Sequence, residues 1–73
     1  MRYKLVGSSR SRTTEVYKGE DNSLVEVYYF KSGAIDAKPV PEIDGSLTVR
    51  YDDGEIWETD PIPPEGVRFP AMR

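Results

Sequence analysis

The sequence contains no cysteine and no histidine among its 73 residues. Disulfide bonds are therefore excluded, and so are zinc sites built on Cys or His and nucleophile pairs of the Ser–His or Cys–His type. An oxygen-ligand site for a hard cation stays open, but the acidic residues do not follow the spacing of an EF-hand loop. We therefore expect a protein without enzymatic activity, cofactor or bound metal.

Long apolar runs are also missing. No stretch of about 18 apolar residues occurs, so we expect no membrane-spanning helix and no membrane association. The first residues lack the apolar core of a signal peptide, so the cytoplasm is the expected location. The length predicts one domain, residues 1–73, with a small core made of apolar side chains or completed by oligomerisation.

The net charge of −3 is unevenly distributed along the chain. Residues 1–18 carry five basic side chains and one acidic side chain, whereas residues 19–73 carry five basic and twelve acidic side chains. This asymmetry predicts an acidic face and a basic corner. The acidic balance argues against direct nucleic-acid binding by the whole surface, although Arg10 and Arg12 lie in a Ser-rich loop that could contact phosphate.

Patterns typical of β-strands dominate the sequence, and patterns typical of helices are nearly absent. Residues 24–31 are rich in Val, Tyr and Phe, and residues 47–52 alternate apolar and polar side chains. The sequence predicts an all-β fold, either a small antiparallel SH3-like barrel or a curved sheet of five to six strands. Residues 61–73 form a Pro-rich C-terminal tail, in which Val67 and Phe69 can dock as a short edge strand.

A hairpin pattern occurs twice. Residues 24–38 and 47–59 each read as a strand, a polar turn ending in Gly and a returning strand, and residues 1–18 form an additional N-terminal hairpin. Ser-Gly and Asp-Gly favour two-residue loops, because Gly adopts a positive φ without strain. In that register Phe30 faces Ile35 in the first repeated hairpin.

The length of the loop in the second repeated hairpin decides on which face of the sheet Trp57 lies. A two-residue loop makes Tyr51 face Ile56 and places Trp57 on the outer face beside Arg50, where a cation–π contact is available. A three-residue loop with a Gly bulge instead pairs Val49 with Trp57 and directs the indole to the core. We favour the first register, since it gives matching aromatic–aliphatic pairs in both hairpins.

Aromatic side chains exceed what one face of the sheet can bury. Tyr28, Tyr29 and Phe30 are consecutive, so they must project to both faces of their strand. Together with the acidic residues of the second repeated hairpin, they suggest a surface that binds a cationic partner, although a solvated turn is the simpler explanation of the acidic residues. The candidate partner-binding residues are Trp57, Tyr51, Tyr28, Arg50, Asp52, Asp53, Glu55 and Glu58.

Two segments resemble the last strands of Tudor-like, SH3-type barrels. Residues 47–55 read LTVRYDDGE, and residues 62–68 read IPPEGVR. Residues 25–27 resemble the opening strand of such barrels, whereas residues 34–38 lack the aromatic side chains usual in the following strand. The resemblance implies a five- or six-stranded barrel that binds a short peptide or a protein surface.

Three functional hypotheses follow. The first is a non-enzymatic protein- or peptide-binding module that uses the aromatic and acidic surface and takes another protein or a basic peptide as partner. The alternative is a small acidic inhibitor or accessory factor, of the kind that phages and mobile elements encode, which blocks a basic or nucleic-acid-handling protein. A third hypothesis is a homodimer formed through exposed strand edges.

Overall fold

The computed structural model describes residues 1–41, 48–49 and 55–71 of the chain. They form seven β-strands: β1 (Arg2–Ser8), β2 (Thr14–Gly19), β3 (Leu24–Tyr29), β4 (Ile35–Val40), β5 (Thr48–Val49), β6 (Ile56–Glu58) and β7 (Val67–Phe69). The all-β prediction is therefore confirmed. None of the described residues belongs to a helix with the length and hydropathy needed to cross a bilayer.

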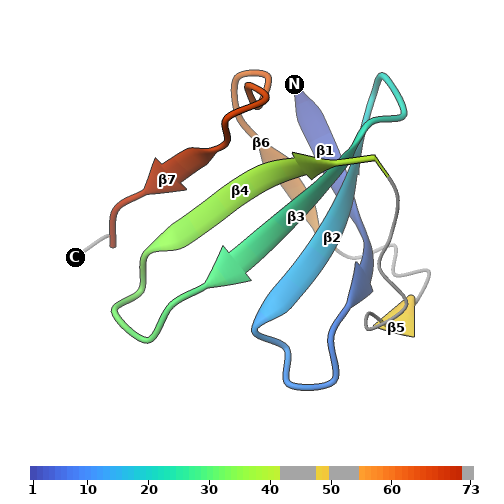
Figure 1. Cartoon of the computed structure of the whole chain (residues 1–73). Helices are drawn as coiled ribbons and strands as arrows, with labels where there is room; N and C mark the ends of the chain where they lie inside the picture. Colours follow the sequence, from blue (N-terminus) through green and yellow to red (C-terminus); the bar gives the residue numbers. More distant parts are fainter. Residues whose placement is uncertain (42–47, 50–54, 72–73) are drawn as a thin grey trace.

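The strands form one antiparallel sheet that curls into a half-barrel (Figure 1). Across the sheet the order is β5-β1-β2-β3-β4-β7, and β6 also pairs with β1. The seven strands thus occupy six positions, because β5 and β6 share one edge of β1. A bulge between Leu5 and Gly7 interrupts the β1–β2 register and adds local twist to the sheet.

The hairpin at residues 24–38 forms, but the favoured two-residue loop is wrong. Ile35 faces Tyr29 rather than Phe30. The amide of Phe30 donates to the carbonyl of Ala34 at 3.0 Å, and the amide of Gly33 donates to the carbonyl of Phe30 at 3.0 Å. Gly33 has a φ of 90°, so it is the bulge glycine of a three-residue loop.

The two described strands of the segment 47–59 are not the two arms of a hairpin. Val49 pairs with Gly7 and Ile56 pairs with Lys4, so β5 and β6 both run antiparallel to β1. Two strands that are antiparallel to the same neighbour, on the same edge, run in the same direction as each other. This pairing corrects the hairpin prediction for β5 and β6; the Asp-Gly turn itself lies outside the described residues.

The hydrophobic core lies on the concave face of the half-barrel. Its buried members are Tyr3, Leu5, Tyr17, Val25, Val27 and Ala37. They occupy alternate positions on their strands, as expected when one face of an antiparallel sheet is buried. Partly buried Trp57 on β6 and Phe69 on β7 pack against this core from its two edges.

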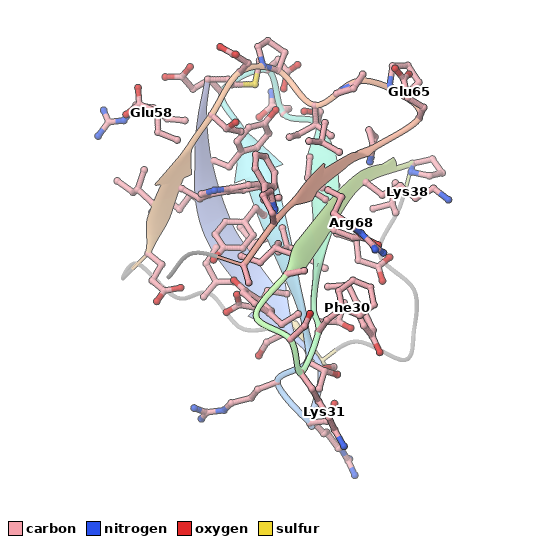
Figure 2. All side chains as sticks on the ribbon, turned by 90° about the vertical axis from the view of Figure 1, so that its left-hand side faces the viewer. Phe30, Lys31, Lys38, Glu58, Glu65 and Arg68 are labelled. Carbon is pink, nitrogen blue, oxygen red and sulfur yellow. The ribbon has the colours of Figure 1, made fainter. Side chains whose placement is uncertain are left out.

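The segment between β6 and β7 crosses over the core. The amide of Ile62 donates to the hydroxyl of Tyr3 at 3.1 Å, which satisfies the polar atom of that buried ring. A turn closed by the amide of Gly66 and the carbonyl of Pro63, at 2.9 Å, then directs the chain into β7. Figure 2 looks onto this side of the molecule, where side chains fill the space between β6 and β7.

Candidate binding pocket

Strand β2 places an acidic and an aromatic side chain side by side on the concave face. Glu15 faces Val27 and Tyr17 faces Val25 across the β2–β3 pair, so both share the inward face with the core valines. Tyr29 extends the same row on β3, because side chains two residues apart on a strand project to the same face. Three polar or amphipathic side chains therefore share the inward face of the β2–β3 pair.

Strand β6 supplies the opposite wall. Trp57 faces Tyr3 across the β1–β6 pair, and the amide of Leu5 donates to the carbonyl of Glu55 at 3.1 Å, which extends this ladder by one residue. The resulting cavity has a volume of about 250 Å³. It is lined by Tyr17, Val27, Tyr29, Ile35, Glu55, Ile56 and Trp57. We call the cavity, together with Glu15 at its end, the aromatic–acidic pocket.

Two carboxylates and two phenols meet in the aromatic–acidic pocket. The hydroxyl of Tyr17 lies 3.2 Å from Oε1 of Glu15 and 3.2 Å from Oε2 of Glu55, and the hydroxyl of Tyr29 donates to Oε1 of Glu15. A phenol has one proton, so Tyr17 donates to only one of the two carboxylates at a time. The pocket therefore retains an acceptor oxygen that a bound donor can use.

Burial and the nearby carboxylates shift the acid–base behaviour of both phenols. Burial, then the hydrogen bond to Glu15, raises the pKa of Tyr29 to about 12. Burial, then the hydrogen bond with Tyr29, raises the pKa of Tyr17 well above the ordinary tyrosine range. Both phenols therefore remain protonated hydrogen-bond donors at neutral pH, and neither contributes negative charge to the pocket.

The indole of Trp57 is held in place by rings on three sides. Its centroid lies 5.7 Å from that of Tyr3, 5.8 Å from that of Tyr17 and 5.4 Å from that of Phe69. Such tilted and edge-on contacts suit the quadrupoles of aromatic rings. The indole is therefore packed among three rings where it forms a wall of the pocket.

No Lys or Arg among the described residues forms an ion pair with Glu15 or Glu55. The ion pair between described residues joins Arg68 to Asp36 on the outer face of β4 and β7, with Nε and Oδ1 2.7 Å apart. The described residues also hold no group of three or more side chains suited to binding a metal ion. The pocket is thus a pair of carboxylates beside aromatic rings.

The predicted partner-binding residues divide between the two faces of the sheet. Trp57 and Glu55 lie together in the aromatic–acidic pocket. Glu58 faces Arg2 on the outer side of β6, since it alternates with Trp57. Tyr28 is 43% exposed on the outer face of β3, where its ring contacts that of Phe30 with centroids 4.9 Å apart.

The remaining predicted residues are not placed. Arg50, Tyr51, Asp52 and Asp53 lie outside the described residues. The expected position of Trp57 on the outer face is wrong, because pairing with β1 places Trp57 opposite Tyr3 and its indole packs against the core. Tyr29 and Phe30 do project to opposite faces, as their consecutive positions require: Tyr29 packs against the core, and Phe30 contacts Tyr28.

The aliphatic lining residues and three polar or aromatic ones, Glu15, Tyr17 and Tyr29, were not among the predicted residues. A signal for the first two was present, because Glu15 and Tyr17 are two residues apart in a strand-like segment and so share a face. What the sequence does not reveal is that β6 lies across β1 from β2, which brings Glu55 to the hydroxyl of Tyr17. No protein-family model, curated protein or solved structure matches this chain, so the functional argument rests on the geometry of its own residues.

Proposed function

We propose that this protein is a non-enzymatic binding module that accepts a basic side chain of a protein or peptide partner in the aromatic–acidic pocket. The observation that carries the proposal is the convergence of Glu15 and Glu55 on the hydroxyl of Tyr17, beside the indole of Trp57. A lysine or arginine head group would be attracted by both carboxylates and by the ring faces.

The dimensions of the pocket support a single side chain as the ligand. Its volume of about 250 Å³ is below the range of about 300–1,000 Å³ typical of sites for drug-sized ligands. A side chain with an apolar stem and a charged head fits this arrangement, because the stem can contact Ile35 and Trp57 while the head reaches the carboxylates. The curled sheet is also compatible with the Tudor-like barrel that residues 47–68 resemble.

The test uses five-residue peptides with Arg, Lys or norleucine between glycines, blocked at both ends. The single tryptophan, Trp57, is the fluorescence reporter. We expect the Arg and Lys peptides to change its emission and the norleucine peptide to have little effect. Glu15→Gln or Glu55→Gln should each weaken binding about tenfold, the equivalent of about 1.4 kcal/mol lost with one charge-assisted hydrogen bond.

Glu58→Gln is the matched control. It also removes one negative charge, but Glu58 lies on the outer face of β6, opposite Arg2. It should leave peptide affinity within about twofold, since exposed charges at this distance are screened by salt. Equal losses in all three variants would show a nonspecific effect of charge. Binding that is indifferent to Glu15 and Glu55 would place the ligand elsewhere.

A further inference from the structure

The loop between β1 and β2, residues 9–13, carries two arginines that the proposed function does not use. We call it the arginine loop. Arg10 and Arg12 are both exposed, and neither side chain forms an ion pair or a hydrogen bond with another described residue. Because an arginine is always charged, the loop presents two guanidinium groups without an anionic partner in the described part of the chain.

Hydrogen bonds order the backbone of the arginine loop. The amide of Ser9 donates to the carbonyl of Thr14 at 2.8 Å, and the amide of Arg12 donates to the carbonyl of Ser9 at 3.1 Å. The hydroxyl of Ser11 lies 3.3 Å from that of Ser9 and 2.8 Å from that of Thr13. The arginines therefore extend from an ordered base, which reduces the entropy lost when one of them is bound.

Arg12 has an unusual backbone conformation. Its φ is 58°, in the left-handed region that Gly or Asn usually occupies. Among the described residues other than glycine, Asn22 is the other one with a positive φ, and asparagine is a common occupant of this region. A strained conformation is typical of positions where the side chain has a function, so Arg12 is the stronger candidate of the two arginines.

The arginine loop lies next to the acidic end of the aromatic–acidic pocket. Glu15 is the second residue of β2, and the amide of Tyr29 donates to the carbonyl of Thr13, the last residue of the loop, at 2.8 Å. The β1–β2 loop and the β3–β4 turn lie at the same end of the sheet (Figure 1). The chain thus holds carboxylates and guanidinium groups toward one end, and no ion pair among the described residues joins them.

We propose that the partner in the aromatic–acidic pocket is a second copy of this chain, whose Arg12 forms ion pairs with Glu15 and Glu55. This inference rests on the proposed function, since it names the basic side chain that the pocket accepts. Because the loop and the pocket lie toward the same end, the exchange can be mutual. Each copy then supplies its Arg12 and receives that of the other, which gives a closed two-fold dimer.

A guanidinium group matches what the pocket leaves unsatisfied. The single proton of the Tyr17 hydroxyl serves one carboxylate at a time, although this hydroxyl lies 3.2 Å from both Glu15 and Glu55. A guanidinium has five donors in one plane, so it can bond both carboxylates at once. A nucleic acid on the arginine loop would instead meet repulsion from the carboxylates close by.

Sedimentation equilibrium over a range of protein concentrations tests the dimer. We expect the mass to rise from that of one chain toward that of two, and higher salt to weaken the association. Arg12→Gln and Glu55→Gln should each raise the dissociation constant of the dimer at least about tenfold. An excess of the blocked Arg peptide should return the protein to the monomer, whereas the norleucine peptide should not.

Mixing the two variants gives a sharper test. An equimolar mixture of Arg12→Gln and Glu55→Gln allows one intact contact per dimer, because the intact pocket of the first variant can receive the Arg12 of the second. The mixture should therefore associate more tightly than either variant alone. A mixture that associates no better than the separate variants would overturn the proposal, because Arg12 and Glu55 would then not meet across the interface.

Lys18→Gln is the matched control. It also removes one positive charge from an exposed side chain, but Lys18 lies at the opposite end of β2 from the arginine loop. It should leave the dissociation constant within about twofold. Equal effects of Arg12→Gln and Lys18→Gln, or a dimer that Arg12→Gln does not weaken, would place the interface elsewhere.

The mass and the peptide titration together separate the two proposals. A protein that stays monomeric at every concentration but responds to the Arg peptide would overturn the dimer and leave the proposed function standing. A monomer that does not respond to the peptide would remove both. A monomer that binds an oligothymidine, and loses this binding in Arg12→Gln, would make nucleic acid the occupant of the arginine loop and overturn the dimer.

Discussion

The indole of Trp57 on β6 meets the phenyl ring of Phe69 on β7 edge-on, with centroids 5.4 Å apart and ring planes at 79°. Among the described strands, β6 pairs with β1 and β7 pairs with β4, and no backbone ladder joins the two. The ring contact therefore links the two edges of the curled sheet directly. It also connects the wall of the aromatic–acidic pocket to the C-terminal strand.

The Trp57–Phe69 contact should appear as a coupling energy. We expect Trp57→Leu and Phe69→Leu each to lower the free energy of unfolding, and the double variant to lose about 0.5–1.5 kcal/mol less than the sum. Urea denaturation of the three variants and the parent protein, followed by far-ultraviolet circular dichroism, measures this coupling. Losses that add to within about 0.3 kcal/mol would mean that the two edges are held independently.

Among the glycines that the structure describes, Gly66 should be the least tolerant of substitution. Its φ is +84°, and a Cβ atom there would lie 2.9 Å from the carbonyl oxygen of Ala37. Gly66→Ala therefore adds a steric conflict with backbone to the strain of a left-handed conformation, and we expect a loss of about 2–3 kcal/mol in the free energy of unfolding.

Gly33→Ala is the natural comparison for that variant. Gly33 has a similar φ of +90°, but a Cβ atom there would lie 3.2 Å from Cβ and 3.9 Å from Cα of Ala71, with no carbonyl oxygen as close as at Gly66. Gly33→Ala should therefore lower the free energy of unfolding by about 1 kcal/mol, which is close to the cost of the left-handed backbone conformation alone. If thermal or urea denaturation gives equal losses for the two variants, the contact with Ala37 is not restrictive.

The sequence predicts the strands more reliably than their partners. The β3–β4 hairpin follows from its apolar strands and its Ser-Gly turn, yet its register is shifted by one residue. Both candidate loops place a glycine at position 33, so turn composition alone does not distinguish them. The shift affects the proposed pocket, because it makes Tyr29 the partner of Ile35 on the pocket side and leaves Phe30 for the outer face.

The internal repeat in the sequence does not predict how the strands pair. Segment 47–59 resembles segment 24–38 in its turn chemistry, but β5 and β6 both pair with β1. Turn residues report local backbone preference, whereas strand pairing depends on which edge is available and on the apolar face that pairing buries. The pocket was therefore predictable in composition, as aromatic plus acidic, but not in its full membership.

The ion pair between Arg68 and Asp36 should control the titration of that carboxylate. Nε and one terminal nitrogen of Arg68 donate to the two carboxylate oxygens at 2.7 and 3.1 Å, and the guanidinium carbon lies 4.8 Å from the Phe30 ring centroid. The hydrogen bond to Arg68 lowers the pKa of Asp36. In Arg68→Met we expect this pKa, measured by carboxyl-carbon NMR, to rise toward its ordinary value.

Asp21 provides an internal control for that titration. Its pKa is lowered mainly by the hydroxyl and amide of Ser23, so it should not respond to Arg68→Met. Because the pKa of Asp36 is depressed in the folded state, its contribution to stability is present above the ordinary carboxyl range and is lost as pH falls through the depressed pKa. In Arg68→Met, the free energy of unfolding should therefore fall less steeply as the pH is lowered. An unchanged dependence on pH would argue against the Arg68–Asp36 ion pair.

The raised pKa of the Tyr29 phenol in the pocket should make the free energy of unfolding depend on pH in the alkaline range. Its pKa is raised to about 12 by burial and then by the hydrogen bond to Glu15, whereas an unfolded tyrosine titrates near 10. The folded state therefore holds this proton more tightly. The resulting stability is fully present below about pH 10 and is lost as pH rises through 12.

Glu15→Gln should lower the pKa of Tyr29 while leaving it above that of a free tyrosine, because burial is the larger cause and remains. Ring-carbon NMR, with each tyrosine resonance followed separately across the alkaline range, measures the change. Glu20→Gln on the outer face is the control and should leave the Tyr29 titration unaltered. If Glu15→Gln also leaves it unaltered, the phenol does not donate to Glu15, and the carboxylate at the end of the pocket must be oriented by another group.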